Sequence, residues 1–219
     1  MGLSKVICLE IEKRLNAIPV NWDGKNSILE MKNAGYSQWK QMEWIGFYFQ
    51  FLCEKYLAGL FEFQIPRYGN SSFDGLFKVP FDFKAHAMNV ESHKIPVNDR
   101  EAIECGIRDY GYVGLIVAGG NVVYDDENRT FYKWHEALKG KESEYVLENR
   151  KRGASSRRRK FSMTLKQILI IEINSKTLAK CGSFQTGFRN SDGSPRREKV
   201  LIDLEKLNEE IVHRIAFTR

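Results

Sequence analysis

The sequence lacks the marks of a secreted, membrane or disulfide-rich protein. Its four cysteines are widely spaced and form no Cys-x-x-Cys pair, which favours free thiols in a reducing compartment. Charged residues interrupt the apolar pattern of residues 1–20, so no signal peptide is expected there. No apolar run is long enough to span a membrane. We therefore expect a cytoplasmic protein with no membrane association.

The chain also lacks internal repeats. Its 219 residues, 42% of them hydrophobic, are enough for one sizeable core and leave little room for two. We therefore expect a single domain over residues 1–219. The net charge of +6 is moderate, but much of the excess gathers in residues 150–160 and 189–199. Clustered basic charge favours a polyanionic partner.

The order of predicted elements favours the α/β (α+β) class, with a mixed β-sheet flanked by helices. A capping pattern in which Glu101 stands three positions after Asn98 predicts a helix start at Asn98. The expected elements are a helix over 5–18, a polar connection, a helix over 37–59, strands over 60–65, 73–79 and 81–88, a helix over 98–110, a buried strand over 112–118, a hairpin pair or one long strand over 161–174, and a closing helix over 200–215.

The third expected strand carries polar side chains on one face. Asp82, Lys84 and His86 alternate with apolar residues, and successive side chains of a strand point to opposite faces. Asp74 has the same parity on the second expected strand. If like faces match, Asp74 lies opposite Lys84 and Asp82 lies near Leu76, although a different turn length would change this register.

The expected helix over 37–59 adds a carboxylate, because Glu54 lies in a strongly apolar stretch. A carboxylate in such surroundings needs a cation, a hydrogen-bond donor or water. At ~1.5 Å per helical residue and ~3.3 Å per strand residue, Glu54 and Asp82 lie about 7–10 Å from the same sheet edge. They can therefore meet at a shared metal ion. Glu43, which projects from nearly the same helix face, is the alternative to Glu54.

Two carboxylates beside a lysine suit phosphodiester hydrolysis with an oxygen-ligated divalent cation. Lys84 would orient or deprotonate the attacking water and offset charge on the phosphate oxygens. No histidine has zinc spacing with cysteine, so we expect Mg²⁺ and no organic cofactor. The competing interpretations are a solvated salt bridge for Asp82 and Lys84, and an ordinary turn or bulge for Asp74.

These residues resemble the PD-(D/E)xK nuclease superfamily, and within it the type II restriction endonucleases. The resemblance covers roughly residues 38–118, with Asp74 on the second strand and Asp82-x-Lys84 on the third. It implies an αβββαβ core, a prokaryotic restriction-modification system, and a homodimer that cuts both strands of a short palindrome. The sequence departs from the family pattern because no proline precedes Asp74 and only seven residues separate it from Asp82. This departure makes Glu54 with Asp82 the more attractive pair of metal ligands.

The basic loops supply candidate DNA contacts. The loop over 150–160 would clamp phosphates, and the loop over 187–199 would read base edges or form an ordinary surface hairpin. Gln41 and Met42 would wedge into a base step, with core packing as the alternative for Met42. The candidates are Gln41, Met42, Arg150, Lys151, Arg152, Arg157, Arg158, Arg159, Lys160, Arg189, Asn190, Arg196 and Arg197.

Three functions fit this sequence. The first is a Mg²⁺-dependent endonuclease that cuts double-stranded DNA at a short specific sequence. The second is a structure-selective nuclease of the same superfamily, such as a junction resolvase. The third is a DNA-binding protein without catalysis, in which Asp82 and Lys84 form a salt bridge and bind no metal.

Overall fold

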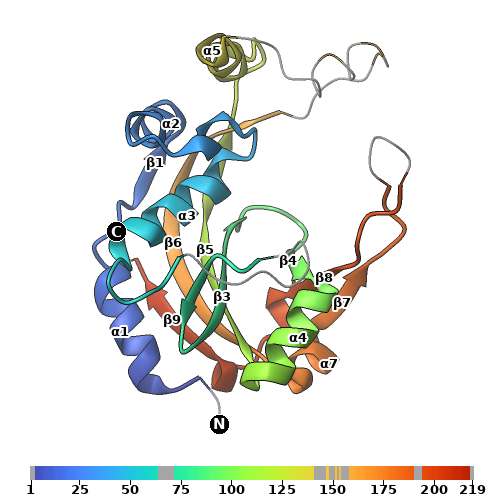
Figure 1. Cartoon of the computed structure of the whole chain (residues 1–219). Coiled ribbons are helices and arrows are strands. Elements are labelled where there is room, and N and C mark those ends of the chain that lie inside the picture. Colours follow the sequence, from blue (N-terminus) through green and yellow to red (C-terminus); the bar gives the residue numbers. More distant parts are fainter. Residues whose placement is uncertain are drawn as a thin grey trace.

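The chain folds around two β-sheets, with helices packed on them (Figure 1). The computed structural model describes residues 3–63, 72–140, 147, 151, 153, 158–189 and 194–217. The larger, mixed sheet has the strand order β1-β6-β5-β3-β2, with β9 also paired to β6, and the smaller sheet has the order β4-β8-β7. This architecture confirms the expected α/β class with a mixed sheet.

The elements divide the chain into a helical N-terminal part and a strand-rich remainder. Their bounds are α1 Lys5–Leu15, β1 Asn21–Asp23, α2 Gly24–Asn33, the 3₁₀ turn η1 Ser37–Lys40, α3 Trp44–Tyr56, β2 Gly75–Phe77, β3 Val79–Ala87, β4 Lys94–Asp99, α4 Arg100–Tyr110, β5 Val113–Tyr124, α5 Thr130–Lys139, β6 Lys160–Ile173, α7 Ser175–Cys181, β7 Gly182–Gln185, β8 Lys199–Asp203, η2 Leu204–Lys206, η3 Glu209–Ile211 and β9 Val212–Ala216.

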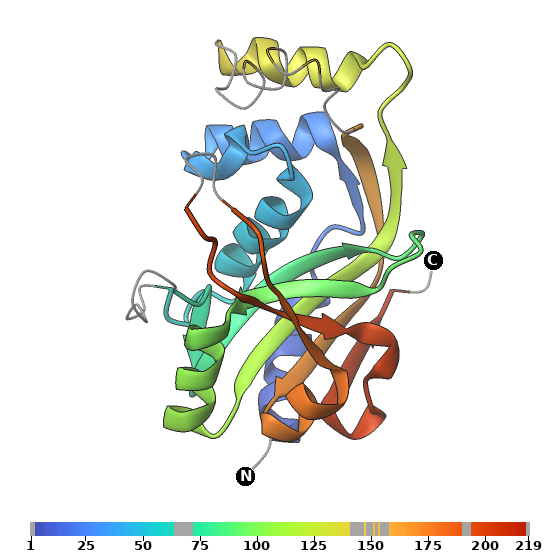
Figure 2. The same ribbon diagram turned by 90° about the vertical axis from the view of Figure 1, so that its right-hand side faces the viewer.

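The strands β3, β5 and β6 form the centre of the larger sheet. β2 and β3 are an antiparallel hairpin, α4 provides the crossover from β3 to the parallel strand β5, and β6 returns antiparallel to β5. The two long strands β5 and β6 run through much of the molecule (Figure 2). A strand buried on both faces reads as a continuous apolar run, which is why β5 was predictable from sequence.

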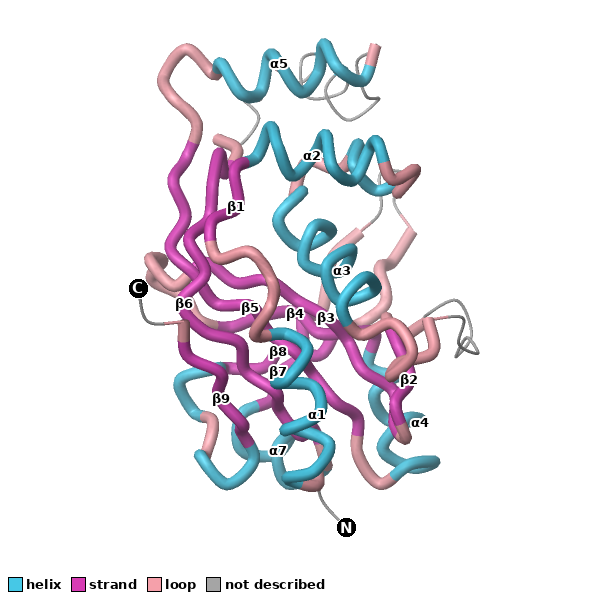
Figure 3. The backbone as a smooth tube through the Cα atoms, turned by 90° about the vertical axis from the view of Figure 1, so that its left-hand side faces the viewer, coloured by secondary structure: helices cyan, strands magenta, loops and turns pink. Residues whose placement is uncertain are grey.

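Two hydrophobic clusters cover the two faces of this sheet. One contains the inward side chains of α1 and α3 and the apolar face of β3, including Phe81 and Phe83. The helices of this side lie in front of the sheet in Figure 3. The other cluster joins α4, β4 and β8 to the opposite side chains of β5, including Leu115 and Val117. The alternation along β3 therefore separates a core face from the face that carries Asp82.

The expected helix over 37–59 is wrong in its first part. The chain forms the 3₁₀ turn η1, becomes extended at Gln41, and starts α3 at Trp44. Trp39 and Trp44 are both buried, with 9% and 1% of their surface exposed. On one continuous helix, residues five apart point about 140° away from each other. The break lets both indole rings reach the core.

The helix start predicted at Asn98 is also wrong. Asn98 is part of β4, and α4 begins at Arg100 after the N-cap residue Asp99. The Asn98 side chain turns inward instead, where its amide donates to the Ser72 carbonyl at 3.1 Å and to Asp82 at 3.3 Å. Its side chain therefore serves the interior of the protein rather than the helix end.

The C-terminal part differs most from expectation. The closing helix expected over 200–215 is absent, and β8, two 3₁₀ turns and β9 occupy this stretch. Val200 and Ile202, which lie two residues apart on β8, are both buried. A spacing of two residues between buried side chains is the period of a strand. The stretch over 161–174 forms one long strand, β6, as in the second of the two alternatives. The polar connection after α1 contains β1 and α2, and α5 was not predicted.

The hairpin before the candidate site is shorter than expected. The second expected strand is reduced to β2, and its turn lies at Lys78, which has a φ of 63°. Of the first expected strand, Phe61 and Glu62 form only isolated bridges, and residues 64–71 lie outside the described part. No helix within the described ranges combines the length and apolar character needed to cross a membrane.

Candidate active site

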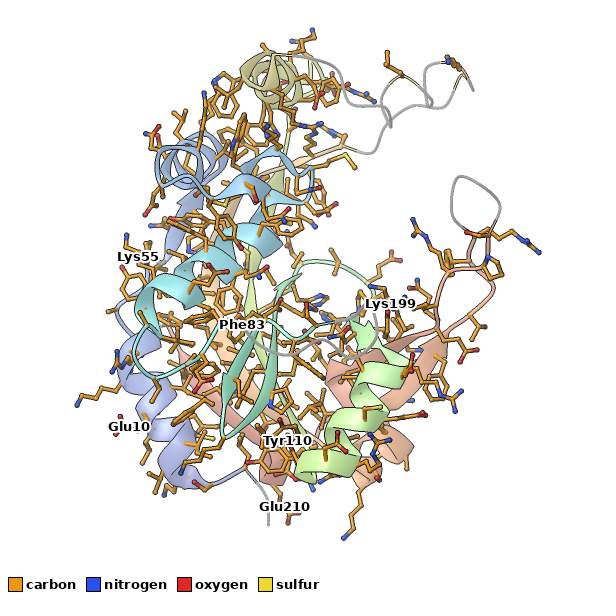
Figure 4. All side chains as sticks on the ribbon, in the orientation of Figure 1. Glu10, Lys55, Phe83, Tyr110, Lys199 and Glu210 are labelled. Carbon is orange, nitrogen blue, oxygen red and sulfur yellow. The ribbon has the colours of Figure 1, made fainter. Side chains whose placement is uncertain are left out.

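The buried carboxylate of Asp82 lies at the centre of the candidate site. It belongs to β3, between β2 and β5, and pairs in register with Leu115. Its side chain is 2% exposed. Phe83, the next residue, marks the position of this strand in Figure 4. A carboxylate so deep in a sheet needs donors or a cation to remain ionised.

Asp74 directly precedes β2, and the β2–β3 register continued by one residue brings it to Asp82 and not to Lys84. β2 and β3 pair with Gly75 opposite Phe81, and the Asp74 backbone N–H extends the ladder by donating to the Phe81 carbonyl at 2.9 Å. The predicted register is therefore wrong by two residues, because the turn is centred on Lys78 and not at the next position. A register shift of two residues leaves each side chain on the same face of the sheet. Asp74 and Asp82 consequently still share one side of the sheet.

Lys84 brings the two carboxylates together. Its Nζ atom is 3.6 Å from Asp74 Oδ2 and 3.6 Å from Asp82 Oδ1. Desolvation acts to lower the pKa of Lys84, but the negative charges of Asp82 and Asp74 outweigh it, and the pKa is raised. Lys84 is thus a cation held between two carboxylates, with 28% of its side chain still exposed.

The charge state of Asp82 depends on competing effects. Its pKa is raised from 3.8 to about 7, chiefly by burial and further by the charge of nearby Asp74. Lys84 and the Asn98 amide act in the opposite direction. Among the described residues, Asp82 Oδ2 is buried and has no hydrogen-bond partner. A buried carboxylate oxygen without a partner is costly unless a ligand completes it.

Glu54 lies near enough to Asp74 for the pKa of its carboxyl group to respond to that charge. Its carboxylate accepts a hydrogen bond from the Tyr36 hydroxyl at 3.2 Å. Burial raises the pKa of Glu54, the Tyr36 bond lowers it, and the charge of Asp74 raises it. The geometry therefore favours Asp74 with Asp82 as the closest carboxylate pair, rather than Glu54 with Asp82. Glu43, the alternative to Glu54, instead pairs with Lys160 at 2.8 Å.

Asn98 is the residue of the site that sequence reasoning missed. It lies at the end of β4, is 8% exposed, and holds Asp82 Oδ1 while its own Oδ1 accepts from the Asp99 backbone. The only available signal was an asparagine directly after the apolar alternation of Ile95 and Val97. That signal was outweighed by the capping pattern.

The arginine-rich stretch 150–160 is not a uniform surface loop. Arg150, Arg152 and Arg157 lie outside the described residues, and Lys151 is exposed. Arg158 is exposed and donates twice to the Asp125 carbonyl, at 3.0 and 2.6 Å. Lys160, which begins β6, is partly buried against Glu43.

The expectation that Arg159 contacts DNA phosphates is contradicted. Its side chain is 2% exposed and pairs with Glu136 at 2.5 Å. It also lies 2.8 Å from His135 Nδ1 and stacks on the Tyr132 ring. Arg159 therefore fastens α5 to the start of β6, and its guanidinium is not available on the surface.

The other candidate contacts are on the surface. Gln41 is exposed and Met42 half-buried in the break between η1 and α3. The second loop continues the β7–β8 hairpin, since Arg189 forms a bridge with Pro195 and the Arg196 N–H donates to the Phe188 carbonyl. Arg197 pairs with Asp99 at 3.2 Å. Asn190 lies outside the described residues.

Comparison with known proteins identified no relative. No family model matches the chain, and neither a curated protein nor a solved structure does.

Proposed function

We propose that this chain is a Mg²⁺-dependent endonuclease that hydrolyses phosphodiester bonds in double-stranded DNA. The observation that carries the proposal is the joint position of Asp74, Asp82 and Lys84. The lysine Nζ is equidistant from both carboxylates, and a buried Asp82 oxygen has no partner among the residues that the structure describes. Lys84 and the Asn98 amide both contact Asp82 Oδ1 and leave Oδ2 open. The unpartnered oxygen supports a site built for a further ligand.

The donor chemistry of the site fits magnesium. Within the described ranges, no three histidines, cysteines or acids are placed to hold a metal by themselves. Mg²⁺ does not need such a cage, because it usually binds through one or two carboxylates and completes its shell with water and substrate phosphate. Asp74 and Asp82 provide these carboxylates, and Glu54 lies beside them. When bound, Mg²⁺ would polarise the phosphate and supply a metal-activated water.

The side chains of the site have different roles in the proposed reaction. Asp82 and Asp74 supply negative charge on one face of the sheet, and Asn98 orients the Asp82 carboxylate. Lys84, which is protonated between the two acids, donates to the phosphate oxygens and positions the attacking water. Without a divalent cation, the same carboxylates repel a DNA phosphate. Activity at this site therefore requires the metal.

Several finer statements belong to the same proposal. The resemblance to type II restriction endonucleases supports cleavage at a short palindrome by a homodimer, since each chain supplies one centre and two strands must be cut. Surface arginines, including Arg158, Arg196 and Arg197, would contact the DNA backbone or base edges. Gln41 and Met42 remain candidates for contacts in the groove.

The experiment that tests the activity uses the full chain on supercoiled plasmid and on a linear duplex without junctions, with Mg²⁺ or EDTA. The proposal predicts discrete fragments from both substrates with Mg²⁺ and intact DNA with EDTA. Cleavage restricted to branched DNA would favour a structure-selective nuclease. Binding of the duplex with no cleavage at any Mg²⁺ concentration would contradict an endonuclease and leave a DNA-binding protein.

A further inference from the structure

A histidine pair lies beyond the candidate active site on the same strand face. His86 is on β3, and His93 precedes β4. Their facing nitrogens, His86 Nε2 and His93 Nδ1, are 3.0 Å apart, and both rings line a cavity of about 170 Å³ together with Met88, Gln167 and Glu205. At ~3.3 Å per strand residue, His86 is about 13 Å along β3 from Asp82. The pair is therefore separate from the proposed magnesium centre.

The surroundings favour one tautomer of His93. Its other nitrogen, Nε2, is 4.0 Å from the carboxylate of Glu205. A neighbouring carboxylate keeps a proton on the nitrogen that faces it, and histidines that bind metals usually have such a partner on the opposite ring nitrogen. In the tautomer with the proton on Nε2, which faces this carboxylate, the lone pair of His93 Nδ1 points to His86.

His86 is suited to be the second ligand. Burial lowers its pKa to about 4, helped by the charges of His93 and Lys160, so its imidazole is neutral at ordinary pH. With this His93 tautomer, His86 Nε2 carries a hydrogen and donates it to His93 Nδ1 when no metal is bound. Metal binding would need the other neutral tautomer of His86, in which solvent has taken this proton from Nε2 and returned one to Nδ1, so that both facing lone pairs are available.

The spacing of the two nitrogens is close to that of zinc ligands. With Zn–N distances of about 2.0–2.1 Å and tetrahedral angles, two ligating nitrogens lie about 3.3 Å apart. The observed separation is 3.0 Å, so the rings need to open by only a few tenths of an ångström. Glu205, whose side chain is 71% exposed, can follow such a movement.

We infer that His86 and His93 form a binding site for zinc or a similar transition-metal ion, with Glu205 as the positioning carboxylate. Because no third such ligand completes the group in the described part of the chain, the site is open and its other positions go to water or to another oxygen ligand such as a phosphate. This inference does not rest on the proposed nuclease activity.

The test is titration of the full chain with Zn²⁺ by calorimetry, in a reducing buffer with saturating Mg²⁺, followed by the absorption spectrum with Co²⁺. We expect one ion per chain, bound at least ten-fold more weakly by His86→Gln and by His93→Gln, and also weakened in Glu205→Gln. His213→Gln is the matched control, because His213 is also partly exposed and paired with a carboxylate, Glu12. It should bind like the native chain.

An NMR measurement on the native chain tests the inference even if a variant fails to fold. Zinc should shift the ¹⁵N resonances of His86 Nε2 and His93 Nδ1, and leave those of His213 unchanged. Asp82→Asn should retain zinc binding, which separates this site from the carboxylate centre. Unchanged histidine resonances at excess Zn²⁺ would overturn the inference, and so would a zinc affinity of His86→Gln and His93→Gln equal to that of the native chain.

Discussion

The burial of the Asp82 carboxylate predicts how the free energy of unfolding changes with pH. Its pKa rises from an ordinary 3.8 to about 7 on folding, so between these pH values the folded state binds more protons than the unfolded state. The stabilisation from this proton is complete below pH 3.8 and is lost as pH rises through 7. At about 1.4 kcal/mol per pH unit, the loss is up to about 4 kcal/mol.

Asp82→Asn removes this titration at nearly constant side-chain shape. The free energy of unfolding of the native chain should fall by up to about 4 kcal/mol relative to the variant between pH 4 and pH 8. Urea denaturation with EDTA, at pH steps across this range, measures the difference. Asp109→Asn is the control, because Asp109 is well exposed beside Arg108. Parallel curves for Asp82→Asn and the native chain would refute the reasoning, and a native chain that gains stability with pH would mean that Lys84 outweighs burial.

Four further substitutions test contacts at the site and elsewhere in the fold. Asn98→Ala removes the donor to the buried carboxylate on β3, so stability should fall by about 1–3 kcal/mol and the cleavage pH profile should move upward, because that donor lowers the carboxylate pKa. Arg159→Met leaves Lys139 as the ion-pair partner of Glu136 among the described residues. Urea denaturation should show a loss of about 3 kcal/mol, largely recovered by adding Glu136→Gln. Gly114→Ala places a Cβ against the phenyl ring on β3 and should lower the melting temperature, whereas Gly46→Ala, with open space around it in α3, should raise it. No loss with Gly114→Ala, or a loss with both, would contradict the packing described.

The alternation of polar and apolar side chains on β3 was predictable because it depends only on local strand geometry. Phe81 and Phe83 belong to one core cluster, and Asp82 lies on the other side. The register of β2 was not predictable in the same way. It depends on a single turn residue, Lys78, whose left-handed backbone conformation has no clear sequence signal.

The role of individual basic residues could not be predicted because their partners are distant in sequence. In the run of arginines before β6, Arg158 is exposed and Arg159 is buried. What distinguishes them is Glu136, which comes from α5 and meets Arg159 only in the folded chain. Likewise, the capping pattern at Asn98 was a valid local signal, and the tertiary contact with Asp82 replaced it.

The measurement that tests the central claim most directly is DNA cleavage with Mg²⁺ by the native chain, Asp82→Asn and Lys84→Ala, with DNA binding measured in EDTA. Lys13→Ala, on the exposed side of α1, is the matched control. We predict that Asp82→Asn and Lys84→Ala bind DNA but lose cleavage by at least about a hundred-fold, and that Lys13→Ala cuts like the native chain. Full cleavage by either site variant would contradict a reaction centre formed by Asp74, Asp82 and Lys84.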